Sequence, residues 1–155
     1  MGLLVATLLA ALPAPVTLTG VGGVVPGMTP AQVSARWGTG PLALETAPGS
    51  TCAVVGIAKG NVRGYAIFEE RRFGAVFFKK GVRTDTGIGI GSTLADLRKV
   101  YGSRLGILPD KYTPKAKNVF VEGKKASLRF DVNPQGRVTV IAFGGIAVTY
   151  VEACS

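Results

Sequence analysis

One stretch of sequence predicts the fold: GMTPAQVSARWG at residues 27–38, which recurs as GSTLADLRKVYG at residues 91–102. The opening glycine, the threonine, the alanine and the closing glycine align, and so do the aromatic residues Trp37 and Tyr101. A repeat of this length predicts one supersecondary unit that is used twice, with each copy covering apolar surface that the other cannot bury alone.

Each copy of the repeat carries the signals of a short helix. Its threonine suits the N-cap, and Gln32 or Asp96, three residues later, can complete a capping box. Its closing glycine can take the left-handed conformation that ends many helices. Apolar residues recur between these signals at three- and four-residue spacing, so each helix has one apolar stripe. We therefore expect equivalent helices over residues 29–38 and 92–102, on the same face of one antiparallel sheet.

Strands are expected after each helix. They are residues 51–59, 64–70, 73–80 and 82–86 in the first half, and residues 118–122, 125–132, 137–143 and 146–152 in the second. The run FGAVFF at residues 73–78 is apolar on both faces, which predicts a helix on one side and another layer, or a partner, on the other. A short helix followed by antiparallel strands, occurring twice, predicts an α+β fold of two repeats whose helices pack on one face of an antiparallel sheet.

The chain is expected to form one domain after an apolar leader. Residues 3–12 form an apolar run that prolines follow; the run is too short to span a bilayer but suits a secretory signal. No Lys or Arg precedes Arg36, so a buried apolar terminus is the alternative. We expect a signal peptide or apolar leader over residues 1–20. A single domain over residues 21–155, made of repeats 21–86 and 87–155, would then be secreted or extracytoplasmic.

The chain has two cysteines, Cys52 and Cys154. An even pair in an exported protein predicts a disulfide, which would hold the two Cα atoms about 4.4–6.8 Å apart. The bridge would close a loop of about 100 residues, for which loop-closure entropy allows up to about 4–5 kcal/mol. The alternative is two free thiols in a reducing compartment.

The doubled helix start, the aromatic-glycine helix ends, the strands after each helix and the terminal Glu152, Ala153 and Cys154 resemble the tandem-repeat fold of the β-lactamase inhibitory proteins. Single-copy relatives of that fold occur in small outer-membrane lipoproteins of the SmpA/OmlA type. The resemblance covers residues 21–155 and implies helical units behind a concave antiparallel sheet whose open face binds a protein. This chain has one cysteine in each half rather than a disulfide within each repeat, and the resemblance assigns no functional residue.

The composition argues against an enzyme. Histidine is absent, which removes the commonest general base and the commonest neutral metal ligand. The two cysteines and the nine Asp and Glu residues show no metal-binding spacing. The adjacent Glu69 and Glu70 would point to opposite faces of a strand and could not share a substrate. We therefore expect a non-enzymatic protein with no catalytic residue, no cofactor and no metal.

The chain is strongly basic, with 18 Lys and Arg residues against nine Asp and Glu and a net charge of +9. One interpretation is attraction to an anionic surface, such as an envelope polymer, phospholipid, nucleic acid or an acidic protein. The other is a soluble, self-repelling surface whose lysines mark turns and sheet edges. Nucleic acid ranks low because the sequence contains no recognised nucleic-acid-binding module.

A long loop is expected over residues 104–117, in place of the short turn that usually follows a helix. It carries Lys111, Lys115 and Lys117 around Tyr112 and contains two prolines. A tyrosine with a cationic rim is a common makeup for contact surfaces, so we predict that these four residues bind a partner. A solvated connector with Tyr112 packed inward is the alternative.

The sequence therefore predicts an exported, non-enzymatic binding protein that uses its sheet face to bind a protein partner, as a hydrolase inhibitor would. The alternative is a cell-envelope factor that binds anionic polymer or lipid through its basic surface. No transmembrane span is expected. Ionic strength separates the two functions, because polymer attraction weakens with salt while a packed interface persists.

Overall fold

A single antiparallel sheet forms most of the molecule. The computed structural model describes residues 11–154, and within them seven strands pair in the order β3-β4-β5-β9-β8-β7-β6. Their bounds are β3 Cys52–Lys59, β4 Val62–Glu69, β5 Arg72–Lys80, β6 Leu105–Pro109, β7 Lys117–Glu122, β8 Ser127–Val132 and β9 Val138–Gly144. A separate two-stranded sheet consists of β1 Val16–Thr17 and β2 Gly20–Val21. The helical elements are α1 Pro30–Trp37, α2 Leu94–Tyr101 and the 3-10 helices η1 Gly102–Arg104 and η2 Ile146–Thr149.

The two α-helices begin and end where the sequence predicts. In α1 the Thr29 hydroxyl accepts from the Gln32 N–H at 3.2 Å, and the Gln32 side chain accepts from the Thr29 N–H at 2.9 Å. In α2 the Thr93 hydroxyl and the Asp96 carboxylate make the same pair of bonds, at 3.1 and 2.8 Å. These bonds satisfy N–H groups that the first turn of a helix leaves without partners. Gly38 ends α1 with a φ of +68°, a conformation that glycine adopts at little cost.

The capping box of α2 should make its stability depend on pH. The backbone N–H of Thr93, and then its side chain, lower the pKa of Asp96 below its ordinary value. A carboxyl group with a lowered pKa stabilises the fold above its unfolded pKa, and this contribution is lost as the pH falls through the folded value. We therefore expect Asp96→Asn to lower the melting temperature at pH 7 and to change it less and less as the pH falls. Thermal unfolding between pH 2 and pH 7 measures this.

The neutral capping box of α1 supplies the control for that measurement. Gln32 does not titrate, so Gln32→Ala is expected to lower the melting temperature by a similar amount at every pH. A loss for Asp96→Asn that is independent of pH would contradict the prediction, because the carboxylate charge would then have no part in capping α2.

The expected fold of two packed repeats is wrong. The sheet dominates the molecule, and the two α-helices, of eight residues each, do not pack on it as equivalent units. The first helix contacts the inner strand β5, whereas the second contacts η1 and the edge strand β6. Each helix is too short to bury more than a few side chains, Val33 and Trp37 in the case of α1. Pairing between strands, rather than helix packing, therefore sets the architecture.

Two strand predictions and one loop prediction also need correction. Residues 82–86 form only isolated bridges, and residues 146–152 begin with the 3-10 helix η2. Strand β6 lies where a long loop was expected, because its glycine and proline hide the strand pattern. Proline is tolerated in β6 because this strand is at the edge of the sheet. Residues 104–117 are therefore not one long loop; they include β6, a turn at residues 110–116 and the start of β7.

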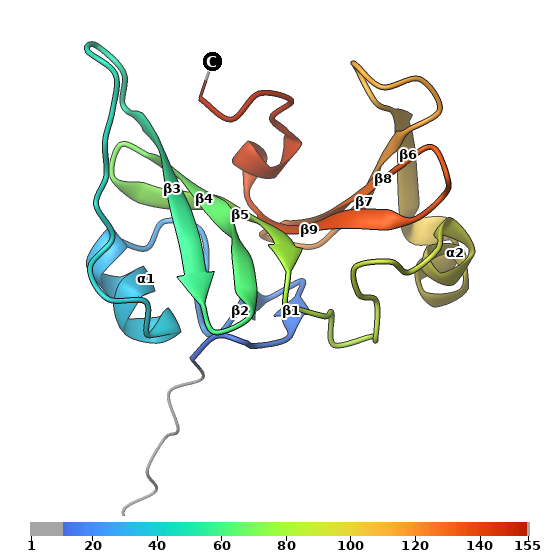
Figure 1. Ribbon diagram of the computed structural model, residues 1–155, viewed down its shortest axis with the longest axis horizontal. Coiled ribbons are helices and arrows are strands. Elements are labelled where there is room, and N and C mark those ends of the chain that lie inside the picture. Colours follow the sequence, from blue (N-terminus) through green and yellow to red (C-terminus); the bar gives the residue numbers. More distant parts are fainter. Residues whose placement is uncertain (1–10, 155) are drawn as a thin grey trace, which may run out of the picture.

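Apolar side chains cover both faces of the sheet. In β5, Phe73 and Phe78 belong to a large cluster around Trp37, while Ala75 and Phe77 belong to a smaller one. We call these two sides of the sheet the core side and the concave side. The β1–β2 hairpin and α1 lie on the core side, and the last residues of the chain lie on the concave side, between the two rising arms of the sheet (Figure 1). The prediction that this strand is covered on both faces is confirmed.

Residues 11–20 belong to the folded domain. The N–H of Leu12 donates to the carbonyl of Trp37 at 3.3 Å, the N–H of Val16 donates to the carbonyl of Arg83 at 2.9 Å, and the Leu12 and Val16 side chains are buried. The leader boundary expected at residue 20 therefore falls inside the domain, and residues 1–10 of that prediction lie outside the described part of the chain. Across residues 11–154, no helix is both long and apolar enough to cross a membrane.

Candidate functional site

The concave side carries a row of side chains that neighbouring strands place next to one another. Across the sheet, the row consists of Phe120 on β7, Arg129 on β8, Ala142 on β9, Phe77 on β5 and Tyr65 on β4. The Tyr65 and Phe77 rings stack with their centroids 5.0 Å apart. The guanidinium carbon of Arg129 lies 5.6 Å from the Phe77 centroid and 5.7 Å from the Phe120 centroid. The row therefore combines aromatic rings with one central cation.

The middle of this row is covered by residues 145–154, which we call the C-terminal segment. Its 3-10 helix η2 buries Ala147 and Val148 on the concave side (Figure 1). The fully buried sheet residues of the same cluster are Ile67, Ala75, Phe77 and Ala142. The sheet face that the resemblance implies to be open is therefore partly filled by the chain itself. A partner on this side would meet a surface that includes the C-terminal segment.

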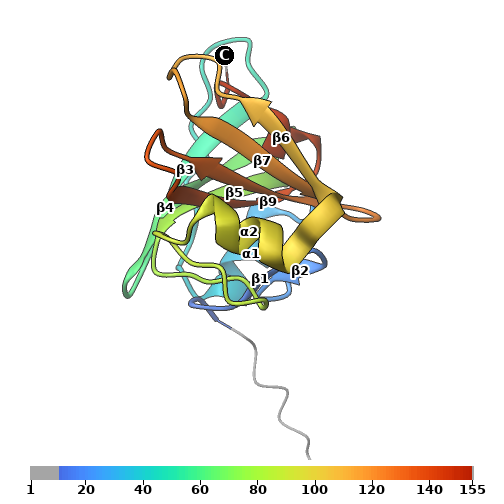
Figure 2. The same ribbon diagram turned by 90° about the vertical axis from the view of Figure 1, so that its right-hand side faces the viewer.

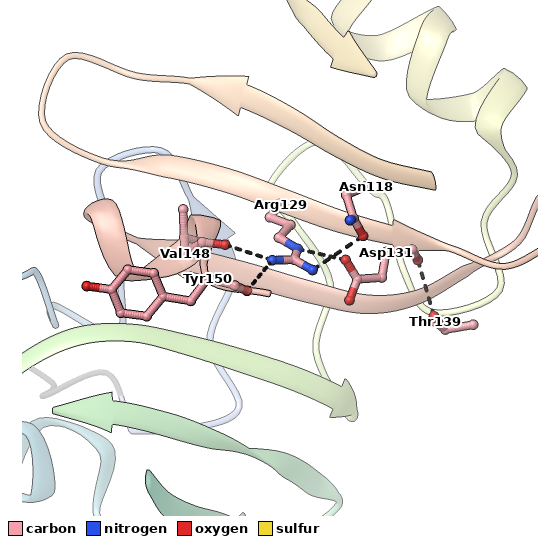
Figure 3. Close-up of polar contacts among 6 residues, drawn as sticks. All are labelled: Asn118, Arg129, Asp131, Thr139, Val148 and Tyr150. Carbon is pink, nitrogen blue, oxygen red and sulfur yellow. Dashed lines mark hydrogen bonds and ion pairs between the residues drawn. The ribbon is translucent and has the colours of Figure 1, made fainter. Parts of the chain in front are cut away.

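Arg129 attaches the C-terminal segment to the sheet (Figure 3). Its guanidinium donates to the carbonyl oxygens of Val148 at 3.1 Å and Tyr150 at 2.8 Å. It also donates to the Asp131 carboxylate at 2.7 Å and the Asn118 side-chain oxygen at 3.3 Å. The Arg129 residue is only 6% exposed, and a buried guanidinium is tolerated only where its donors find acceptors. The C-terminal segment supplies two of these acceptors, so the arginine and the segment stabilise each other.

Burial dominates the electrostatics of this centre. It is the largest influence on the pKa of Asp131, which stands above its ordinary value although the adjacent Arg129 guanidinium lowers it. Burial also raises the pKa of the Tyr65 hydroxyl, against the opposing effect of Arg129. Within residues 11–154, no group of three or more His, Cys, Asp or Glu side chains is placed to hold a metal ion. Because the charged groups engage each other and backbone carbonyls, the arrangement is that of a structural ion pair.

A disulfide between Cys52 and Cys154 holds the end of the C-terminal segment against β3. The two Cα atoms are 5.6 Å apart, which confirms the bridge that the sequence predicts. Nearby, the Tyr150 hydroxyl donates to the Glu69 carboxylate at 2.7 Å. A pocket of about 450 Å³ lies among these residues. The segment is therefore tied to β3 and β4 at this end and to β8 through Arg129.

Two of the four predicted binding residues, Lys111 and Tyr112, lie near the C-terminal segment. Lys111, Tyr112 and Lys115 belong to the turn between β6 and β7, and Lys117 begins β7. Tyr112 is 60% exposed, and its hydroxyl donates to the Glu152 carboxylate of the segment. The Lys111 ammonium lies 5.0 Å from the Tyr112 ring centroid. Tyr112 is thus not packed inward, and a contact role for these residues stays a prediction.

A second accessible group of side chains, which the sequence analysis did not predict, lies on the opposite arm of the sheet. The Lys79 ammonium lies 5.7 Å from the centroid of the half-buried Tyr65 ring. Gly56 pairs with Tyr65 and has no side chain to cover the ring. A pocket of about 440 Å³ lies here, and Arg63 also lines it. The alternation of side chains along β4 and β5 could have predicted that these residues share one face. Only the register between the strands brings them together.

The comparisons with known proteins concern the fold. No protein-family model matches the chain, and no functionally curated protein matches it. The fold is similar to that of a DUF4309 family protein, YjgB, from Bacillus subtilis, with 13% identity and a TM-score of 0.51 over 76% of this chain and 78% of that one. It is also similar to a cysteine-rich secretory protein, SAV1118, from Staphylococcus aureus, with 11% identity and a TM-score of 0.54 over 86% of this chain and 48% of that one. At such identities the likeness extends to the fold alone.

Proposed function

We propose that this protein is an extracytoplasmic, non-enzymatic binding module whose partner is another protein. The observation that carries the proposal is a set of exposed apolar side chains on the C-terminal segment and on the two elements that it contacts, β3 and the β6–β7 turn. Tyr112, Val151, Ile146 and Val54 are 60%, 49%, 72% and 44% exposed. Exposed aromatic and aliphatic side chains that gather on one side of a molecule, with cations beside them, are typical of contact surfaces.

The way in which the C-terminal segment is held supports this proposal. The disulfide, the Arg129 hydrogen bonds and the Tyr112–Glu152 contact hold the segment in one position. A surface that is ordered before binding loses less conformational entropy when it binds. A disulfide is also compatible with an oxidising compartment outside the cytoplasm. In the β-lactamase inhibitory proteins the sheet face binds a protein, and we propose the same use here, with the C-terminal segment as part of the contact surface.

Substitutions in the β6–β7 turn test the proposal. The full chain is used to capture its partner from the extracellular fraction of its own culture, and the dissociation constant is then measured. The triple variant Lys111→Gln/Lys115→Gln/Lys117→Gln and the single variant Tyr112→Ser are each expected to weaken binding by about tenfold, which corresponds to about 1.4 kcal/mol. The melting temperature should change little, because Lys111, Tyr112 and Lys115 are exposed and Lys117 is half-buried.

A second triple variant controls for total charge. Arg36→Gln/Arg98→Gln/Lys99→Gln also removes three positive charges, from exposed positions on the two α-helices. It is expected to bind the partner as the wild type does. Equal losses of affinity in the two triple variants would point to a general effect of charge and would contradict the proposed contact surface.

A second candidate function is attachment to an anionic polymer or lipid of the cell envelope. It is favoured by the net charge of +9, which comes from 18 Lys and Arg residues against nine Asp and Glu. At least nine of these cations therefore have no Asp or Glu carboxylate to neutralise them. Raising the salt concentration from 50 to 500 mM should release the protein from isolated envelopes if this function holds, whereas a packed protein interface should largely persist.

A further inference from the structure

A groove of about 770 Å³ lies on the core side of the molecule and contains no residue of the C-terminal segment. Five parts of the chain line it: the turn between β1 and β2, the residues that follow β2, the end of η1, the turn between β7 and β8, and strand β9. Figure 2 shows the β1–β2 hairpin and the β7–β8 turn at the same end of the molecule. The volume is within the range of about 300–1,000 Å³ that small-molecule sites occupy.

The floor and walls of the groove are apolar. Phe143 and Ala126 line it and are otherwise buried, while Leu18 and Pro26 are partly exposed. Val25 is 36% exposed. Water in an apolar groove finds few hydrogen-bond partners, so an apolar occupant that displaces it gains free energy.

Close packing of the β7–β8 turn forms one wall of the groove. The N–H of Gly123 donates to the carbonyl of Ala126 at 2.9 Å. A Cβ at Gly123 would lie 2.5 Å from that carbonyl oxygen and 3.2 Å from Cδ2 of Leu18. Glycine therefore lets the turn approach Leu18 closely, which sets the position of this wall.

One rim of the groove is cationic. Arg104, Lys124 and Lys125 line the groove, and no acidic residue does. The Arg104 guanidinium donates to the carbonyl of Glu122 at 3.1 Å, which holds it near the turn. Neither Lys124 nor Lys125 forms an ion pair within the part of the chain that the structure describes. Three positive charges therefore border an apolar cavity without a carboxylate to neutralise them.

We infer that this groove binds a single-chain amphiphile with an anionic head group, of the fatty-acid class. The acyl chain would lie on the apolar floor, and the carboxylate would accept charge-assisted hydrogen bonds from Arg104 and the two lysines. The positive rim selects an anionic group, and the apolar floor selects an amphiphile over a free anion. This site is separate from the concave side and does not depend on the proposed function.

Titration calorimetry of the full chain with palmitoleic acid, below its micelle concentration, tests the inference. We expect saturable binding of one molecule per chain. The rim variant Lys124→Gln/Lys125→Gln is expected to weaken binding by about tenfold, and so is replacement of the acid by its uncharged methyl ester. Val25→Glu places a negative charge on the wall of the groove and is expected to remove detectable binding, because it repels the carboxylate and leaves the apolar surface incomplete.

Two controls keep the test decisive. Arg98→Gln/Lys99→Gln also removes two adjacent exposed cations, which do not line the groove, and is expected to bind palmitoleic acid as the wild type does. Circular dichroism shows whether each variant is folded. The comparison of acid with ester uses the wild type alone, so it does not depend on the folding of any variant. The inference is overturned if palmitoleic acid does not bind saturably, if acid and ester bind equally, or if the protein binds only vesicles of phosphatidylglycerol.

Discussion

Replacing both Cys52 and Cys154 with serine is expected to lower the free energy of unfolding by about 4–5 kcal/mol. The bridge joins residues that are 102 positions apart. A cross-link that closes a loop of about 100 residues lowers the conformational entropy of the unfolded chain by an equivalent of about 4.7 kcal/mol. Because a domain of this kind is stable by only about 5–15 kcal/mol, the double variant would be marginally stable.

Urea unfolding of three forms measures this loss: the oxidised wild type, the reduced wild type and the double serine variant. The last two should agree, since both lack the covalent bridge. In the two forms that lack the bridge, the rate of amide hydrogen exchange should rise first in residues 146–154, because Cys154 ties that segment to β3 in the oxidised wild type. A difference of less than about 1 kcal/mol between the oxidised and reduced wild type would contradict the prediction, and would indicate that the reduced unfolded chain retains structure that keeps its two cysteines close together.

Replacing Arg129 with methionine is expected to lower the free energy of unfolding by about 3–5 kcal/mol. Methionine is of similar length, but it donates no hydrogen bond. The substitution leaves the half-buried Asp131 carboxylate without its ion-pair partner and the carbonyls of Val148 and Tyr150 without their donor. Removing one member of a buried ion pair is costly because the other charge remains uncompensated. Chemical denaturation at pH 7 measures the loss.

The pH dependence of this loss separates an electrostatic cause from lost packing. Without Arg129, the pKa of Asp131 should rise further above its unfolded value, because burial already raises it in the wild type. A carboxyl group with a raised folded pKa destabilises the fold as the pH rises from the unfolded value through the folded one. The methionine variant should therefore lose less stability near pH 4 than at pH 7. The double variant Arg129→Met/Asp131→Asn should recover part of the loss at pH 7.

A matched control is available at the surface. The exposed side chain of Arg137 makes one hydrogen bond, from its guanidinium to the carbonyl of Gly91 at 3.0 Å. Arg137→Met is expected to cost less than about 1 kcal/mol, because water replaces that bond. Equal losses for the substitutions at Arg129 and Arg137 would contradict the assignment of Arg129 as the residue that holds the C-terminal segment.

Part of the fold and of the site could be predicted from residues that are close in sequence. Thr29 and Gln32 lie three positions apart, and the bonds that cap α1 connect only these neighbours. Tyr112 could be expected at a turn because prolines and lysines surround it. Its contact with Glu152 could not be expected, because the two residues are 40 positions apart and meet only through the folded sheet.

The role of Arg129 shows where prediction from the sequence ends. Alternation in the stretch SLRFDV at residues 127–132 places Arg129 on the face opposite Leu128 and Phe130, as the structure has it. Such a position is usually solvated in an antiparallel sheet. Here the C-terminal segment covers this position, so the arginine is buried among backbone carbonyls.

The sequence by itself determined the capped ends of the helices, most of the strands and the pairing of its two cysteines. Only the tertiary structure decided that β5 and β9 are the strands that join the two halves of the sheet, and that the C-terminal segment lies over its concave side. The physical reason is the range of the interactions. A cap or a turn depends on hydrogen bonds between near neighbours, whereas strand order and the burial of a segment depend on contacts between distant residues, which no local pattern specifies.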